Sequence, residues 1–111
     1  MTASSALAAS ATDPSGGLLT ADLLSFGAFG VAGSGLVTAV TADGLRSPGP
    51  VQEIPVALLR AGLESALSAR RFTAVKIGIV PSAPAVRAIA RGLAHLPAPR
   101  VLHPGFAPRS G

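Results

Sequence analysis

Cysteine, tryptophan and tyrosine are all absent from this chain of 111 residues. Without cysteine the chain has no disulfide, no thiolate metal ligand and no thiol nucleophile. The only aromatic residues are four phenylalanines, so the core must be built from alanine, valine, leucine and isoleucine. Because 49% of the residues are hydrophobic, we nevertheless expect an ordered fold, and the length suits one small domain.

Acidic residues are also scarce, with five Asp and Glu against nine Lys and Arg, a net charge of +4. The two histidines, His95 and His103, lack the spacing of metal ligands, so we expect no metal site made by this chain alone. Only Arg70 and Arg71 are adjacent basic residues. Nucleic-acid-binding proteins usually cluster charge on one face and add stacking aromatics. We therefore interpret the charge as a solvated arginine-rich surface, with a polyanion-binding surface as the weaker alternative.

Long apolar runs are missing as well. The longest, residues 28–40, is interrupted by three glycines and a threonine, and it is shorter than the ~20 residues that span a membrane. The N-terminus lacks the basic region of a secretory signal. These absences predict a cytoplasmic protein with no nucleic-acid partner and no membrane partner.

Short apolar segments alternate with amphipathic ones along the chain. Thr20 and Ser82 are expected helix N-caps, and Gly30 is an expected helix end. Strands that alternate with helices predict an α/β fold with a parallel sheet and right-handed crossovers. The expected elements are strand 6–11, helix 22–29, strand 35–40, helix 55–70, strand 74–79, helix 84–96 and a strand beginning at 100–102.

The run 12–17, Thr-Asp-Pro-Ser-Gly-Gly, follows the first expected strand. Ligands of parallel sheets bind beyond the carboxyl ends of the strands, and this loop lies at such an end. Local structure is the favoured interpretation of several polar residues, with ligand contact as the alternative. Asp13 suits an Asx turn, Asp22 suits the first turn of a helix, and Asp43 before Gly44 suits a turn. The pattern alone leaves both interpretations open.

Two further residues have both a structural and a chemical interpretation. Lys76 lies in a buried strand, where we expect its amine to reach the strand edge, with a catalytic role as the weaker alternative. His103 lies beside Pro104, which suits a surface position, with anion binding as the alternative.

Taken in order, the motifs resemble the N-terminal half of the hydroxymethylpyrimidine/phosphomethylpyrimidine kinases of thiamine biosynthesis. The resemblance implies a truncated, three-layer ribokinase-like (Rossmann-like) fold, with a parallel sheet and flanking helices. It also implies that residues 1–111 form a single partial domain. The matching segments are 6–17 with its Asp-Pro-Ser-Gly-Gly loop, Ala21-Asp22-Leu23, Gly30-Val31, Thr38-Ala39-Val40-Thr41-Ala42, Val75-Lys76-Ile77-Gly78 and 101–111.

The resemblance also implies a function and a set of site residues. Members of the family use ATP to phosphorylate the pyrimidine's hydroxymethyl group and then the phosphomethyl product, so ATP and Mg²⁺ are implied cofactors. By position, Asp22 would hydrogen-bond the aminopyrimidine, and Gly78 would line the floor beneath the ring. Gly16 and Gly17 would let the backbone approach the ring. Asp43 stands where the family has a substrate-contacting Gln, and an ionised Asp can only accept hydrogen bonds.

Several departures from the family pattern concern activity. Only three residues separate Gly17 from Ala21, whereas the family usually has four. The family's glycine-rich anion hole and catalytic Cys come later in its sequence and have no counterpart here. We therefore expect the pyrimidine side of a kinase site, completed by a separate C-terminal half or by a homo-oligomer. A non-catalytic or decayed small-molecule-binding module is the alternative.

Overall fold

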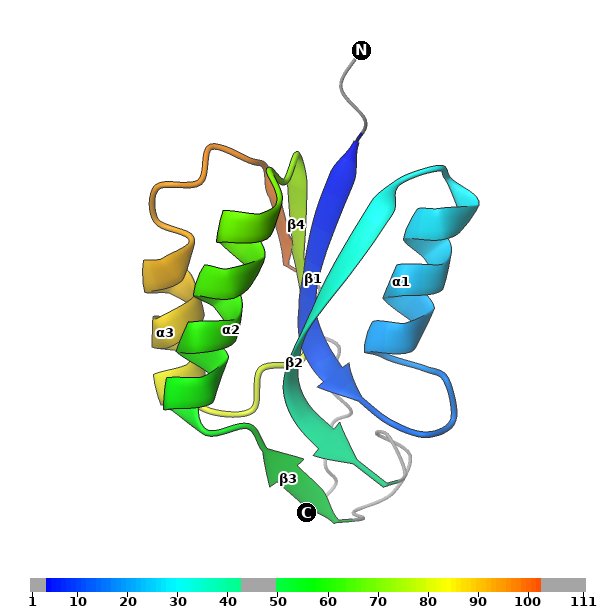
Figure 1. Ribbon diagram of the computed structural model, residues 1–111. Coiled ribbons are helices and arrows are strands. Elements are labelled where there is room, and N and C mark those ends of the chain that lie inside the picture. Colours follow the sequence, from blue (N-terminus) through cyan, green and yellow to red (C-terminus); the bar gives the residue numbers. More distant parts are fainter. Residues whose placement is uncertain (1–3, 43–49, 103–111) are drawn as a thin grey trace.

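The fold is a single sheet of five strands with helices on both faces, seen in a computed structural model that describes residues 4–42 and 50–102. The strand order is β3-β2-β1-β4-β5. Helix α1 lies on one face of the sheet, and α2 and α3 lie on the other (Figure 1). The elements are β1 Ser5–Thr12, α1 Leu19–Ala28, β2 Ala32–Thr41, β3 Val51–Glu53, α2 Val56–Ala69, β4 Ala74–Ile77, α3 Ala83–Gly92 and β5 Arg100–Leu102.

The predicted α/β architecture with three layers is confirmed, with one difference in the sheet. Strands β1, β2, β4 and β5 are parallel. Strand β3, which the sequence does not predict, pairs antiparallel to β2, with Glu53 opposite Ala39. All three residues of β3 are exposed, so no alternation of buried and exposed positions indicates a strand there.

The helix ends differ in part from the prediction. Helix α1 begins at Leu19, three residues earlier than expected, and Leu18 is its N-cap without a side-chain bond. The predicted cap Thr20 therefore lies inside the helix, whereas Asp22 does lie in the first turn. The predicted cap Ser82 is confirmed, since its hydroxyl accepts a hydrogen bond of 3.3 Å from the Ala85 amide.

The main core lies between the sheet and helices α2 and α3. Its largest fully buried side chains are leucines and a valine. Helices α2 and α3 approach closely at Gly92, where a Cβ atom would collide with Leu63. This face therefore resembles the aliphatic core that the lack of aromatic residues predicts. The main members of the core are Leu7, Ala9, Leu36, Leu59, Leu63, Phe72, Val75, Ile89 and Leu93.

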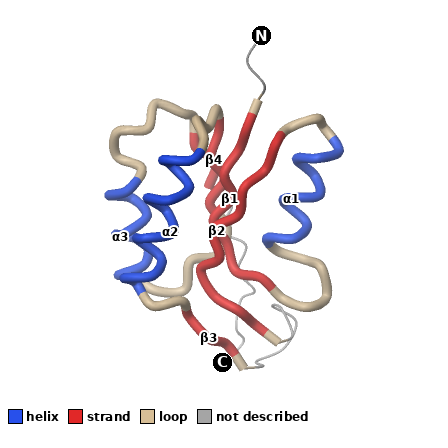
Figure 2. Tube along the Cα trace, in the orientation of Figure 1, coloured by secondary structure: helices blue, strands red, loops and turns tan. Residues whose placement is uncertain are grey.

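The opposite face is covered by α1, which contacts β1 and β2. Figure 2 shows this helix alone on its side of the sheet. It lies close to β2 because Gly33 and Gly35 have no side chains. A Cβ at Gly33 would lie 2.9 Å from the Phe26 ring, and a Cβ at Gly35 would lie 3.1 Å from Leu19. Leu19 is the one buried residue of α1, so this layer is thinly packed.

The sheet ends at β5, which pairs with β4 and with no other strand in the described part of the chain. Val101 and Leu102 in this strand are 59% and 71% exposed.

No helix within residues 4–42 and 50–102 has the length and apolar content to cross a bilayer.

Candidate functional site

The loop after β1 is organised around the carboxylate of Asp13, which is buried. Asp13 Oδ1 accepts hydrogen bonds from the Ser15 amide at 2.8 Å and from the Ser15 hydroxyl at 2.5 Å. The hydroxyl bond from Ser15 is the main reason that the pKa of Asp13 lies below its usual value of 3.8, although burial partly opposes the shift. Asp13 thus has the loop-organising role that its Asx pattern indicates.

Gly16 and Gly17 continue the same loop, and their amides also affect the Asp13 carboxylate. Gly16 has a φ of +88°, a conformation that residues with side chains rarely adopt. After the Ser15 groups, the amides of Gly17 and Gly16 also contribute to the lowered pKa of Asp13. Because these amides lie near the protein's own carboxylate, the pair is poorly suited to bind an external phosphate.

Asp22 and Lys76 form an ion pair that joins α1 to β4. The Lys76 ammonium donates a hydrogen bond to Asp22 Oδ1. The Asp22 side chain is 12% exposed and the Lys76 side chain 29%, so the pair is largely shielded from water. Helix α1 covers β1 and β2, and this ion pair connects it to a third strand, β4. Strand β4 carries Lys76 here because successive side chains of a strand point to opposite faces, and Val75 points into the core.

Gly78 follows β4 and lies directly against Ser10 of β1. Its amide donates to the Ala9 carbonyl at 2.8 Å. A Cβ atom at Gly78 would lie 2.6 Å from Ser10 Oγ, so only glycine fits without displacement of the Ser10 side chain. The absence of a side chain keeps the surface flat beside Asp22 and Lys76.

Two buried hydroxyls fix the segment after β4. Ser10 Oγ accepts a hydrogen bond of 3.1 Å from the Ile79 amide, and Thr38 Oγ1 donates one of 2.6 Å to the Ile79 carbonyl. Ser10 and Thr38 are 3% and 1% exposed. Neither residue is among the predicted site residues, and the available signal is a polar residue inside an apolar strand.

Asp22, Lys76, Gly78 and Ser10 line one cavity of about 240 Å³ at the carboxyl ends of β1 and β4. It brings together a carboxylate, an ammonium group, a hydroxyl and a glycine floor, a set that suits a small, flat, polar molecule. Of the predicted site residues, Asp22 and Gly78 meet here, whereas Gly16 and Gly17 do not line this cavity. The lining residues are Ser10, Leu18, Ala21, Asp22, Lys76, Gly78 and Ile79.

A second hollow of about 620 Å³ lies beside the ends of β1, β2 and β3, with Asp13 in its wall. Asp43, another predicted site residue, lies outside the described residues, as does His103. Among the residues that are described, no three His, Asp or Glu side chains lie together as metal ligands.

Comparison with known proteins agrees with the resemblance seen in the motifs. A family model described as phosphomethylpyrimidine kinase matches residues 13–111. The hydroxymethylpyrimidine/phosphomethylpyrimidine kinase of Rhizobium meliloti (strain 1021) is 34% identical over 107 residues, which cover 96% of this chain and 40% of the relative. The protein of the same name from Escherichia coli (strain K12) is 37% identical over 89 residues, 79% of this chain and 34% of the relative.

Solved structures show the same fold. Phosphomethylpyrimidine kinase from Clostridium difficile 630 superimposes with a TM-score of 0.85 at 28% identity, over 97% of this chain and 48% of that one. A pyridoxal kinase from Staphylococcus aureus, in complex with AMP-PCP and pyridoxal, gives a TM-score of 0.84 at 23% identity, over 96% and 40%. The predicted ribokinase-like fold is thereby confirmed. The chain spans less than half the length of each of these relatives.

Proposed function

This chain belongs to the phosphomethylpyrimidine kinase family, and from that membership we propose that it forms the pyrimidine-binding part of a kinase site. The reaction proposed is ATP-dependent phosphorylation of hydroxymethylpyrimidine and then of its phosphate, in thiamine biosynthesis. The observation that carries the proposal is the meeting of Asp22 and Gly78 at one cavity, with Lys76 bound to Asp22.

Asp22 is proposed to accept a hydrogen bond from the exocyclic amine of the pyrimidine. An ionised carboxylate is an acceptor only, with two oxygens. Because Lys76 donates to Oδ1, Oδ2 is the oxygen assigned to the substrate. Lys76 is a positioning residue in this account, since its bond fixes the direction of the carboxylate. It also balances a charge that would otherwise be shielded from water and unpaired.

Gly78 is proposed to form the floor under the pyrimidine ring. A flat ring needs a flat surface, and the backbone at Gly78 provides one because no Cβ separates it from the cavity. The clamps from Ser10 and Thr38 to Ile79 hold this floor in place. Gly16 and Gly17 are proposed to act indirectly on the substrate, by holding the loop that leads into α1. Asp43 is proposed to contact the substrate in the place of the family's Gln.

The phosphoryl-transfer side of the site is proposed to come from polypeptide beyond this chain. Phosphoryl transfer depends on groups that position the nucleotide and stabilise charge on the transferred phosphoryl group. The described residues fit Mg²⁺ poorly, because Asp13 is bonded by its own loop and Asp22 by Lys76. ATP and Mg²⁺ are therefore assigned to the complete enzyme, and no step is assigned to them here.

The partner proposed is a separate C-terminal half, with a second copy of this chain as the alternative. Strand β5 offers it an edge with exposed Val101 and Leu102. Unpaired strand edges with apolar side chains tend to recruit further polypeptide. Self-association or poor solubility of the isolated chain is expected for the same reason.

An enzyme assay tests the proposal. The chain is mixed with hydroxymethylpyrimidine, ATP and Mg²⁺, alone and together with the C-terminal segment of the Rhizobium meliloti relative. We expect phosphorylated product only from the mixture, and a rate at least about tenfold lower with Asp22→Asn, which removes one charged hydrogen-bond acceptor. Failure of both samples to form product contradicts the kinase proposal. If calorimetry then still detects pyrimidine binding, the non-catalytic binding module replaces it.

A further inference from the structure

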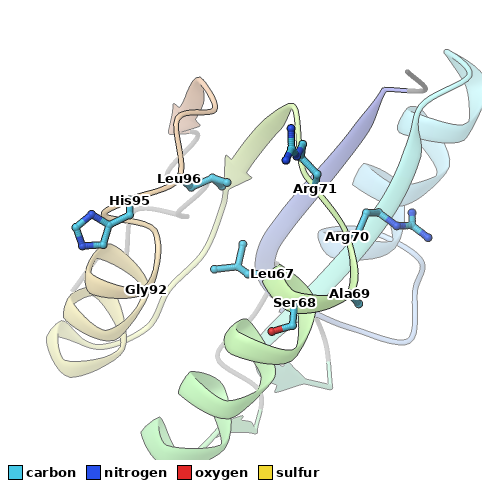
Figure 3. A pocket seen from close by; sticks show the side chains of 8 residues that line it. All are labelled: Leu67, Ser68, Ala69, Arg70, Arg71, Gly92, His95 and Leu96. Atoms are coloured by element: carbon cyan, nitrogen blue, oxygen red, sulfur yellow. The ribbon is translucent and has the colours of Figure 1, made fainter. Parts of the chain in front are cut away.

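A hollow of about 490 Å³ lies between the C-terminal ends of α2 and α3, on the face of the sheet opposite α1. Figure 3 shows Leu67 of α2 and Leu96 from the segment after α3 directed toward the space between them. Arg71 lies at its upper rim, whereas the Arg70 side chain extends away from it. The hollow thus has an apolar floor and a cation at its edge.

This hollow continues in both directions along the surface. A hollow of about 300 Å³ shares Leu67 and Gly92 with it and adds Arg60 and Arg91. Another of about 510 Å³ shares Arg71 and Leu96 with it and ends at residues 97–99. We refer to the three together as the α2–α3 groove. Its elongated outline suits an extended chain better than a compact small molecule.

The groove carries uncompensated positive charge. Arg60, Arg71 and Arg91 are exposed, and none of them forms an ion pair or side-chain hydrogen bond with the described residues. Glu64 is the one acidic residue among the described lining residues. A guanidinium fork is well suited to bind a carboxylate through two parallel hydrogen bonds.

Carbonyl groups that would repel an anion are already covered at the end of α3. The Arg100 guanidinium donates to the Leu93 carbonyl and, at 3.2 Å, to the Leu96 carbonyl. The negative end of this helix is thus partly neutralised from within the chain. Arg71 and Arg91 remain available for a partner.

We propose that the α2–α3 groove binds an extended acidic polypeptide segment. Carboxylates of the partner would pair with Arg60, Arg71 and Arg91, and its apolar side chains would rest on Leu67 and Leu96. Phe72 is the one aromatic ring of Phe, Tyr or Trp among the described lining residues, and it is 3% exposed. The bases of a nucleic acid would find no such ring to stack on, so a peptide is the better match. The groove lies on the other face of the sheet from Asp22, and the proposal does not depend on kinase activity.

The test is fluorescence anisotropy with a labelled peptide of about ten residues, mainly glutamate with two leucines. We expect saturable binding that weakens as sodium chloride is raised, because salt screens exposed charges. The double variant Arg71→Gln/Arg91→Gln should bind about tenfold more weakly or worse, since two charge-assisted contacts are lost. Arg87→Gln is the matched control, because Arg87 is an exposed arginine of α3 that lines none of the three hollows.

Three results would overturn the proposal. One is the absence of saturable binding by the native chain. A second is a loss of peptide affinity in Arg87→Gln that equals, per charge removed, the loss in the double variant, which would show a diffuse charge effect. The third is stronger binding of a single-stranded oligonucleotide of equal charge, which would assign the surface to nucleic acid. Thermal melts of each variant confirm folding, and amide shifts at Leu67, Gly92 and Leu96 in the native chain locate the peptide independently of any substitution.

Discussion

The two faces of the sheet differ in how they are held and in what they carry. On the α2–α3 face, Leu7, Leu59, Leu63 and Leu93 are each 2% exposed or less. On the α1 face a single helix has one buried residue and is joined to β4 by the ion pair of Asp22 with Lys76. Stability is therefore concentrated on one face, and the cavity proposed for the pyrimidine lies on the other. Regions of low local stability commonly supply binding elements for this reason.

The difference has a simple energetic origin. Full burial of a leucine side chain is worth about 1.5–3 kcal/mol, and the α2–α3 face buries several. Helix α1 leaves Leu24 and Phe29 70% and 85% exposed, so these side chains add little. The position of α1 instead depends on close approach over Gly33 and Gly35 and on the hydrogen bond that Lys76 donates to Asp22.

Substitution of one leucine on each face should give the largest difference in the free energy of unfolding. Leu63→Ala should lower the free energy of unfolding by about 2–5 kcal/mol, because it removes buried methyl groups and leaves a cavity. Leu24→Ala should change it by no more than about 0.5 kcal/mol, because that side chain is already in water. Urea denaturation measures both. Equal losses would show that the two faces contribute alike.

An intermediate effect is expected at the floor of the candidate site. Gly78→Ala should destabilise the fold by about 1–3 kcal/mol, because the new Cβ overlaps Ser10, and it should also weaken pyrimidine binding. Gly27→Ala is the control within α1, where a Cβ meets nothing within 4 Å. That change should stabilise the fold by about 0.4–1 kcal/mol. Unchanged stability of the Gly78 variant would remove the close-contact argument.

The smallest effect is a dependence of stability on acid pH. The folded-state pKa of Asp13 is lowered, chiefly by the Ser15 hydroxyl. Its contribution to stability is therefore complete above the unfolded pKa and is lost as the pH falls through the folded one. Thermal melts from about pH 5 to about pH 2 should show a steeper loss for the native chain than for Ser15→Ala. Parallel curves for the two proteins would contradict the assigned role of Ser15.

The order of the helices and of the parallel strands could be predicted because short apolar segments alternate with amphipathic ones along the chain. Strand β3 could not, since Val51–Glu53 contains a single apolar residue and is fixed by pairing with β2. The start of α1 was misplaced because Leu18, with a φ of 53°, precedes the helix without a side-chain cap. Thr20 has the right chemistry for a cap but lies two residues too late.

The candidate site could be predicted only in part. The family resemblance identifies Asp22 and Gly78, which the structure brings to one cavity, although their contact with a ligand stays a prediction. The pairing of Asp22 with Lys76 spans 54 residues of sequence, and no local pattern indicates it. The same holds for Ser10 and Thr38, whose hydroxyls bind Ile79 from two other strands.

Binding of the pyrimidine in the cavity between α1 and β4 can be measured by a titration followed by NMR. Hydroxymethylpyrimidine is added to the native chain and to the Asp22→Asn, Lys76→Met and Leu24→Ala variants. We predict saturable shifts at Asp22 and Gly78, about tenfold weaker binding in the first two variants, and unchanged binding in Leu24→Ala. Shifts elsewhere, or equal affinity in all four proteins, would contradict the account.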